Sequence, residues 1–542
     1  MTDNQPEQPL RWWQTGVTYQ IYPRSFQDTN ADGIGDLPGI LQRLDYLADL
    51  GVEALWLSPF YPSPMKDFGY DVSDYTGVHP LFGTLDDFDR LVQAAHARGL
   101  KIIIDYVPNH TSDQHPWFLE SRSSRNSPKR DWYLWRDAQP DGSPPNNWGS
   151  TFGGPAWTWD EATGQYYFHH FLKEQPDLNW RNPEVRAAML DVLRFWLERG
   201  VDGFRMDVVG MILKDPDWRD NPLNPDAPAH LHPADLAARQ HNLYNQDLDE
   251  VHEIIAEMRR LLDSYGDRVG IGEIWYDLPR WVRYYGQAGE GLHLPFNFRL
   301  ISQPWTAGAV RASVDALEAA LPPFAWPNYV LSNHDVARLA SRIGARQARV
   351  AAMLLLTLRG TPTLYYGDEI GLENGIIAPD QIQDPQGINL GPERTRDVAR
   401  TPMQWSADQH AGFSGVEPWL PLSPDYQERN VDALSHQSGS ILDLYRRLLA
   451  LRRASPGLHG GSYSPLEGGA PDCFVYLRQH SSERWLVALN FGGAERPLAL
   501  PHIGAGQIEA STGMDHSGHI DLRAFTLAAD EGILVRLGAS AD

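Results

Sequence analysis

Residues 85–106 of this 542-residue chain read LDDFDRLVQAAHARGLKIIIDY, an amphipathic segment followed at once by a β-branched run. The apolar spacing predicts a helix over 85–98, and the run after it predicts a strand over 102–106. Seven further strands are expected at 18–21, 54–57, 203–206, 269–274, 292–296, 329–331 and 363–366. Helical patterns lie between them at 38–49, 184–198, 248–264, 310–319 and 345–358. Eight strands alternating with helices favour an α/β fold, a closed (β/α)8 TIM barrel.

Two long irregular stretches interrupt this alternation. Residues 106–179 are rich in Trp, Pro, Gly and Asn without a helical period, so we expect a subdomain inserted after the third strand. A second stretch, 368–430, follows the eighth strand, and loops of this length are usually functional. Short alternating runs near the end predict a C-terminal β domain. The expected domains are the barrel at 1–105 and 180–453, the subdomain at 106–179 and the β domain at 454–542.

The charge balance excludes several classes of partner. The chain has 46 Lys and Arg against 70 Asp and Glu, a formal charge of −24, which disfavours nucleic acids and anionic membranes. No apolar run approaches the roughly 18 residues of a membrane span, and residues 1–10 lack the pattern of a signal peptide. Cys473 is the only cysteine, so an intrachain disulfide and a Cys-based zinc site are excluded. We therefore expect a cytoplasmic protein without an organic cofactor, a monomer or weak homo-oligomer.

Three carboxylates follow three predicted strands, where the active sites of barrels lie. Asp207 ends the run GFRMD, Glu273 follows GIG, and Asp335 follows SNH. Two carboxylates about 5–5.5 Å apart across a glycosidic bond give retaining hydrolysis, one as nucleophile and the other as acid and then base. Arg205, on the same strand face as Asp207, is expected to keep it ionised, because a nearby cation lowers a carboxyl pKa. Trp275 is expected to form an apolar wall that keeps Glu273 protonated.

With these motifs the chain resembles the α-amylase superfamily of glycoside hydrolases, family thirteen, and within it the oligo-1,6-glucosidase and α-glucosidase branch. The motifs are DYVPNH at 105–110, QPDLN at 175–179, GFRMD at 203–207, GE at 272–273 and SNHD at 332–335. The resemblance implies Asp207 as nucleophile, Glu273 as acid/base and Asp335 as the group that stabilises the transition state. It also implies a C-terminal antiparallel β-sandwich.

The resemblance further implies a pocket that encloses one terminal glucose, so that sugars are removed one at a time. Asp67 and Arg400 would close its far end, and Tyr70 would stack beneath the sugar. The remaining expected substrate-binding residues are His110, Phe152, Phe171, Gln175, Arg205, Val208 and His334.

The segment DTNADGIGD at 28–36 matches the first nine positions of an EF-hand calcium loop. The expected ligands are the side chains of Asp28, Asn30, Asp32 and Asp36 and the backbone carbonyl of Ile34. Position 12 is Gly39 instead of Glu, which weakens binding. The resemblance implies a structural Ca²⁺ or Mg²⁺ here, and the alternative is an Asx turn without metal.

The residue after the expected nucleophile, Val208, bears on the bond that is cleaved. In the resembled branch Val at this position goes with α-1,6 linkages and Thr with α-1,4 linkages, which favours an oligo-1,6-glucosidase acting on isomaltose and similar small neutral oligosaccharides. The alternatives are maltose or sucrose hydrolysis, glucosyl transfer and a non-catalytic family member. Sucrose isomerisation is disfavoured because no Arg-rich motif follows Asp335. The long loop at 214–228 leaves this choice open.

Overall fold

The computed structural model describes residues 9–467 and 469–538. The eight predicted strands form one parallel sheet in the order β10-β11-β1-β2-β3-β7-β8-β9. Because β11 pairs with both β10 and β1, the last strand of this sheet in sequence order lies beside the first, as in a barrel. The predicted TIM barrel is thus confirmed. Its strands are β1 (Thr18–Ile21), β2 (Ala54–Leu57), β3 (Lys101–Tyr106), β7 (Gly203–Met206), β8 (Val269–Gly272), β9 (Leu294–Pro295), β10 (Asn328–Val330) and β11 (Thr361–Tyr365).

The predicted helices cover the outside of this sheet. They are α4 (Leu85–Ala97), α6 (Pro183–Glu198), α7 (Val251–Ser264), α10 (Ala307–Ala320) and α12 (Ala345–Thr357). The single helix expected at 38–49 is wrong, because the chain forms α2 (Leu37–Gln42) and α3 (Leu44–Leu50) with a break at Arg43. The Arg43 guanidinium lies 4.1 Å from the ring centre of Trp405, a contact that local periodicity cannot reveal.

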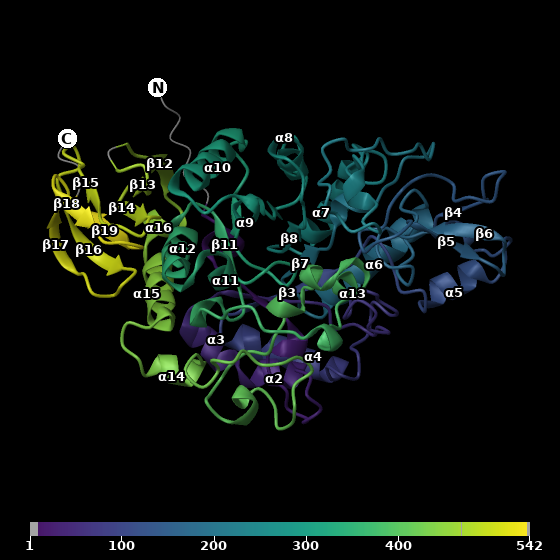
Figure 1. Ribbon diagram of the computed structural model, residues 1–542, viewed down its shortest axis with the longest axis horizontal. Coiled ribbons are helices and arrows are strands. Elements are labelled where there is room, and N and C mark those ends of the chain that lie inside the picture. The colour runs from purple at the N-terminus through teal and green to yellow at the C-terminus, as the bar shows by residue number, and fades with distance from the viewer. Residues whose placement is uncertain (1–8, 468, 539–542) are drawn as a thin grey trace.

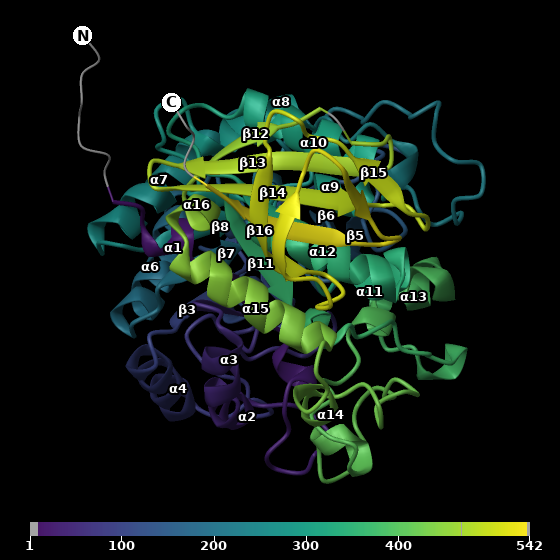
Figure 2. The same cartoon turned by 90° about the vertical axis from the view of Figure 1, so that its left-hand side faces the viewer.

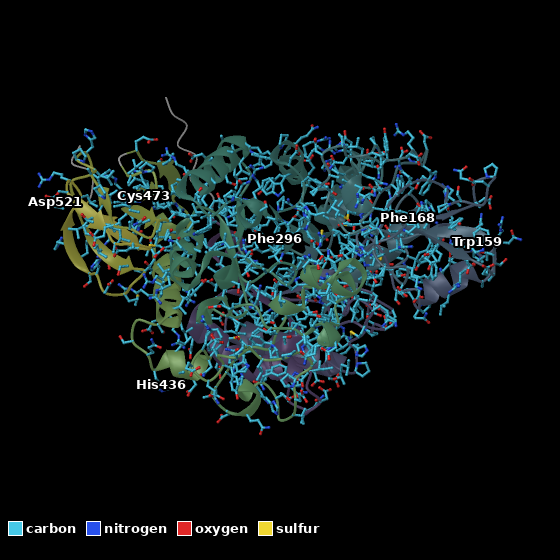
Figure 3. All side chains as sticks on the ribbon, in the orientation of Figure 1. Trp159, Phe168, Phe296, His436, Cys473 and Asp521 are labelled. Carbon is cyan, nitrogen blue, oxygen red and sulfur yellow. The ribbon has the colours of Figure 1, made fainter. Side chains whose placement is uncertain are left out.

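The interior of the barrel is filled by side chains from several strands. Trp56, Ile103, Ile271, Leu294 and Phe296 belong to one buried apolar cluster. Figure 3 places Phe296 in the central body of the molecule. Burying one such side chain stabilises the fold by about 1.5–3 kcal/mol, so the cluster gives the active-site loops a rigid base.

The inserted subdomain lies at one end of the molecule and carries a small antiparallel sheet (Figure 1). Its strands β4 (Trp135–Arg136), β5 (Trp157–Asp160) and β6 (Gln165–Phe168) are arranged in the order β4-β6-β5, and α5 (Pro116–Arg122) precedes them. The loop after β7 packs on this subdomain, where Trp218 lies against Trp148 and Trp157. Trp148 also donates its indole N–H to the carbonyl of Arg219 at 2.9 Å. The subdomain and the loop after β7 are therefore packed together as one unit.

The C-terminal domain lies at the opposite end, and Figure 2 shows its sheet facing the viewer above α15 (Ile441–Ala454). A two-stranded sheet of β15 (Arg496–Leu498) and β18 (Phe525–Leu527) packs against the main antiparallel sheet through a buried apolar cluster. This arrangement fits the expected β-sandwich. The main sheet consists of β12 (Ser462–Pro465), β13 (Cys473–His480), β14 (Glu483–Asn490), β19 (Gly532–Leu537), β16 (Ala505–Ser511) and β17 (Gly518–Asp521).

The exact domain boundaries stay predictions, and residues 1–8, 468 and 539–542 of those ranges lie outside the described residues. Most of the N-terminal stretch interpreted above as lacking a signal peptide is among them. Within the described residues, every helix is too short or too polar to cross a membrane.

Candidate active site

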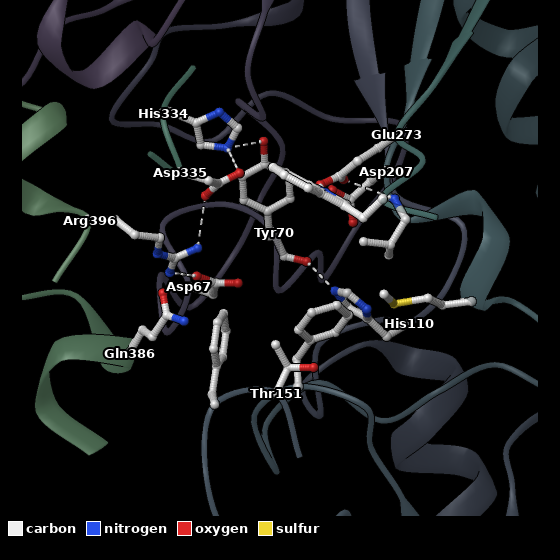
Figure 4. Close-up of a pocket in the computed structure, with 15 residues that line it drawn as sticks. Asp67, Tyr70, His110, Thr151, Asp207, Glu273, His334, Asp335, Gln386 and Arg396 are labelled. Atoms are coloured by element: carbon white, nitrogen blue, oxygen red, sulfur yellow. Dashed lines mark hydrogen bonds and ion pairs between the residues drawn. The ribbon is translucent and has the colours of Figure 1, made fainter. Parts of the chain in front are cut away.

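A cavity of about 320 Å³ lies at the carboxyl ends of the barrel strands (Figure 4). Its volume is at the lower end of the range for small-molecule sites. All three expected catalytic residues and seven of the ten other expected substrate-binding residues line it. The lining residues are Asp67, Tyr70, His110, Thr151, Phe152, Phe171, Asp207, Val208, Met211, Glu273, Trp275, His334, Asp335, Gln386 and Arg396.

Arg205 lies beneath the cavity and joins three carboxylates. Its Nη1 donates to Asp105 Oδ1 at 2.5 Å and to Asp207 Oδ1 at 2.7 Å, while Nη2 donates to Glu273 Oε2 at 2.5 Å. Arg205 is only 1% exposed, so it does not line the cavity. The planar guanidinium therefore fixes Asp207 and Glu273 relative to each other from below.

Arg205 was expected to lower the pKa of Asp207 and does so, but burial has the larger effect. Burial raises the pKa of Asp207 well above its usual value, Arg205 lowers it, and the carboxylates of Glu273 and Asp105 raise it again. The single positive charge is shared among three acidic groups, so it does not outweigh burial.

The expectation that Trp275 forms an apolar wall beside Glu273 is wrong. Its indole Nε1–H donates a hydrogen bond to Glu273 Oε1 at 2.7 Å. The other oxygen, Oε2, accepts the backbone N–H of Val208 at 3.1 Å in addition to Arg205. All three partners are hydrogen-bond donors, so the protein fixes the orientation of both oxygens of Glu273.

Val208 occupies a left-handed backbone conformation with φ 35° and ψ 39°. This region is unfavourable for a β-branched residue, and such strain gathers at functional sites. The conformation points the N–H of Val208 at Glu273 and leaves its side chain in the cavity lining beside Met211. The left-handed turn at Val208 therefore supplies a hydrogen bond to Glu273 and places the Val208 side chain in the cavity lining.

The far end of the cavity is crossed by ion pairs of Arg396. This arginine lies 2.9 Å from Asp67 Oδ1, 3.1 Å from Asp335 Oδ1 and 2.6 Å from Asp384 Oδ1. Its guanidinium also lies 4.9 Å from the ring centre of Phe152, on the subdomain wall. Arg396 thus connects three segments of the chain at this end (Figure 4).

The position expected for Arg400 at the far end is corrected by the structure, in which Arg396 lies there instead. Arg400 is buried behind Asp335, donating to its Oδ1 at 3.0 Å and to the carbonyl of His334 at 2.8 Å. Its guanidinium lies 5.5 Å from the ring centre of Tyr22. Both arginines follow the eighth strand in one loop, so only the conformation of that loop separates their roles.

Asp335 and His334 form a charged and a neutral hydrogen-bonding group side by side. Burial alone would raise the pKa of Asp335, but the charged guanidinium groups of Arg396 and Arg400 hold it well below its usual range. Burial lowers the pKa of His334 to about 3, so its ring is neutral at neutral pH. The ring lies parallel to that of Tyr70 and its Nε2 is 2.8 Å from the tyrosine hydroxyl.

His110 and Gln175 connect the subdomain to the cavity. His110 Nε2 lies 3.1 Å from the carbonyl of Tyr70 and from Gln175 Nε2, and burial lowers the pKa of this histidine to about 4. Gln175 is fully buried behind the lining and donates to Asp67 Oδ2 at 3.1 Å. Gln175 therefore supports Asp67 and does not itself line the cavity.

Four lining residues were not anticipated: Thr151, Met211, Gln386 and Arg396. Met211 and Gln386 lie in short helical turns within long connections, and no charge or motif distinguishes them or Thr151. The clearest available signal was proximity in sequence, since Thr151 precedes Phe152 and Met211 follows Val208 by three positions.

The expected metal loop is folded around its own side chains. Asp28 accepts the backbone N–H groups of Asn30 at 3.0 Å and Gly33 at 2.9 Å, which is Asx-turn geometry. Asp36 accepts the N–H of Gly39 at 2.6 Å and so caps α2. Ala31, Ser414 and Thr29 donate further hydrogen bonds to these carboxylates, so an ion would have to displace some of these donors. The all-oxygen donor set itself suits Ca²⁺ or Mg²⁺.

Comparison with known proteins relates the whole arrangement to one family. A model of the alpha-amylase catalytic domain matches residues 20–461. A probable alpha-glucosidase of Rhizobium meliloti (strain 1021) is 44% identical over 509 residues, covering 90% of this chain and 91% of that protein. An oligo-1,6-glucosidase of Heyndrickxia coagulans is 40% identical over 519 residues, 88% and 92% of the two chains. The crystal structure of an alpha-glucosyl transfer enzyme, XgtA, has a TM-score of 0.91 and 42% identity, covering 98% and 100%.

Proposed function

Because the chain belongs to the α-amylase family of glycoside hydrolases, we propose that it is a retaining, exo-acting α-glucosidase that releases α-glucose from the non-reducing end of short α-glucosides. The observation that carries this proposal is the pair of Asp207 and Glu273, joined by Arg205 at the floor of a cavity that one sugar can occupy. Retaining hydrolysis needs two carboxyl groups in such fixed relation.

The reaction proceeds in two displacements. Asp207 attacks the anomeric carbon while Glu273 gives its proton to the glycosidic oxygen, and the bond to the leaving sugar breaks. Water then attacks the same carbon, its proton passes to Glu273, and the bond to Asp207 breaks. Arg205 contacts both carboxyl groups throughout, so it keeps them aligned as their charges change.

The ionised Asp335 is suited to stabilise the transition state. As positive charge grows on the sugar ring, the ring hydroxyls become more acidic, and hydrogen bonds to a carboxylate strengthen. Arg396 and Arg400 hold Asp335 ionised and oriented for this task. The ion pairs of Arg396 with Asp67 and Asp384 at the far end support removal of one sugar at a time.

The test of this proposal is a comparison of initial rates on isomaltose, isomaltotriose, maltose, sucrose and trehalose, with the product anomers followed by NMR. We expect α-glucose to appear first and isomaltose to be preferred. An initial excess of β-glucose beyond the anomeric mixture that the reducing-end glucose itself contributes would contradict the double displacement, and a preference for maltose or sucrose would contradict only the linkage.

The linkage preference rests on Val208, which offers only methyl groups to the cavity. Val208→Thr is expected to lower the ratio of kcat/KM for isomaltose to that for maltose by about tenfold, because a hydroxyl then faces the leaving sugar. Thr is β-branched like Val, so the left-handed backbone at residue 208 is similarly unfavourable for both side chains and does not affect the comparison. An unchanged ratio would contradict the assignment of specificity to this residue.

Glucosyl transfer is a second candidate activity, favoured by the similarity to an alpha-glucosyl transfer enzyme. An alcohol that occupies the place of water can take the sugar from Asp207. Incubation of maltose with a high concentration of a simple alcohol acceptor should distinguish the two, since hydrolysis yields glucose alone and transfer yields a new glucoside.

We further propose that the loop at 28–36 binds Ca²⁺ or Mg²⁺ as a structural ion, held by the oxygen ligands expected from its sequence. Adding Ca²⁺ to chelator-treated protein is expected to raise the unfolding temperature by about 2–5 °C, because a ligand that binds only the folded state stabilises it. Asp32→Ala should abolish this increase, and the control Asp226→Ala, on another exposed loop, should keep it. An increase that persists in Asp32→Ala would contradict the site.

A further inference from the structure

The indole of Trp275 lines the cavity and contacts the proposed acid/base directly. Its ring lies parallel to that of Phe298, with 4.0 Å between ring centres and 13° between planes. Phe298 is buried, whereas Trp275 is 44% exposed. Stacking on Phe298 therefore holds in place an N–H donor that a sugar entering the cavity can reach.

The two oxygens of Glu273 have different surroundings. Oε2 accepts from Arg205 and from the backbone N–H of Val208, and both donors are buried. A proton on Glu273 must therefore sit on Oε1, which is the oxygen that accepts the Trp275 N–H. A donor aimed at this oxygen favours the carboxylate, so the indole N–H and the carboxyl proton compete for one place.

The proposed reaction needs both states of Glu273 in turn. The O–H form gives its proton to the glycosidic oxygen as that bond breaks, and the carboxylate form takes a proton from water as the bond to Asp207 breaks. The proton lost in the first displacement is returned in the second. The leaving sugar is present at the first displacement and has departed before the second.

We infer that Trp275 is a positioning residue that couples occupancy of the leaving-sugar subsite to the protonation of Glu273, an inference that rests on the proposed α-glucosidase function. With the subsite free of sugar, the indole N–H holds Glu273 as the carboxylate that activates water. A leaving sugar that enters the subsite turns Oε1 away from the indole and toward the glycosidic oxygen, so that Oε1 takes up a proton from water before the glycosidic bond breaks. The proton that Glu273 gains in the second displacement returns to water when the subsite is empty.

Other charged and titratable groups also act on Glu273. Arg205 comes from β7, Asp105 from β3, Asp207 from the end of β7, and Tyr276 follows Trp275 in the chain. Each of them is buried, so each keeps its position whether or not a sugar occupies the leaving-sugar subsite. A change confined to Trp275 leaves all four in place, and its effect on pH dependence can be assigned to the lost N–H.

The test uses Trp275→Phe in the full chain, which keeps an aromatic ring over Phe298 and removes the donor. We measure kcat/KM for isomaltose from about pH 4 to about pH 9. The alkaline limb is expected to move to higher pH by about half a unit to one unit, because the carboxylate loses one of its stabilising donors. The acid limb is expected to stay in place.

A matched control is Trp305→Phe, outside the cavity. The indole of Trp305 likewise donates to a side-chain oxygen, Gln347 Oε1 at 2.8 Å, and its ring packs on Phe491. Both limbs should stay in place in this variant. A merely structural role of Trp275 would change kcat or the unfolding temperature of Trp275→Phe without moving the alkaline limb, and that result would overturn the inference.

The outcomes also separate the inference from the function on which it rests. An active wild-type enzyme with an unmoved alkaline limb in Trp275→Phe overturns the role of Trp275 alone. A folded wild-type protein that cleaves none of the α-glucosides overturns the proposed function and this inference together.

Discussion

Asp207→Asn is expected to lower kcat for isomaltose by about 10⁴-fold or more, since a carboxamide cannot form the covalent glucosyl intermediate and nucleophile removal has effects of this order. The Asn side chain matches Asp in size and its oxygen can still accept the Arg205 hydrogen bond that Asp207 accepts at 2.7 Å. The unfolding temperature should therefore change little. The measurement is kcat by glucose release, alongside a thermal unfolding curve.

A small external nucleophile provides the sharper version of this test. In Asp207→Ala, azide can enter the space of the carboxylate and attack an activated aryl α-glucoside in one displacement, which inverts the anomeric carbon and yields β-glucosyl azide. Formation of α-glucosyl azide from this variant would mean that another residue supplies the nucleophile. Substantial turnover of isomaltose by Asp207→Asn would lead to the same conclusion.

Glu273→Gln is expected to show an effect that depends on the leaving group. With isomaltose, whose leaving alkoxide needs a proton, kcat/KM should fall by about 10²–10⁴-fold, the usual contribution of general acid catalysis. With an aryl α-glucoside whose phenolate leaves unassisted, the first displacement should be nearly unaffected and the covalent intermediate should accumulate. A burst of phenolate followed by a slow steady rate is the measurement.

The stereochemistry of azide capture separates the roles of the two carboxyl groups. Azide that attacks the intermediate on Asp207 in a Glu273→Ala variant completes a double displacement and gives α-glucosyl azide, the opposite anomer from Asp207→Ala. If both variants gave the same anomer, the division of roles between Asp207 and Glu273 would be incorrect.

The barrel could be predicted from sequence because its strands are short, mostly apolar runs between amphipathic segments, as in residues 85–106. The break at Arg43 could not, since its contact with Trp405 joins positions more than 300 residues apart. Local pattern reveals which residues form an element. It does not reveal which distant side chain a charged residue in that element will meet.

The same limit explains the errors at the site. Asp207, Glu273 and Asp335 were placed correctly at the cavity because barrel topology brings strand ends together. Arg396 and Arg400 belong to one irregular loop, and only its folded path decides which faces the sugar. Trp275 was interpreted as apolar, although the direction of its indole N–H depends on the stack with Phe298.

The ion pairs of Arg396 at the far end also constrain the order in which the molecule assembles. The pair with Asp67 joins residues 329 positions apart, so the chain between them must be folded before it can close. Closing so long a loop is entropically costly, and contacts of this range form late. The sugar pocket is therefore among the last parts of the molecule to form, and a nascent chain that has not yet emerged beyond Arg396 has no complete pocket.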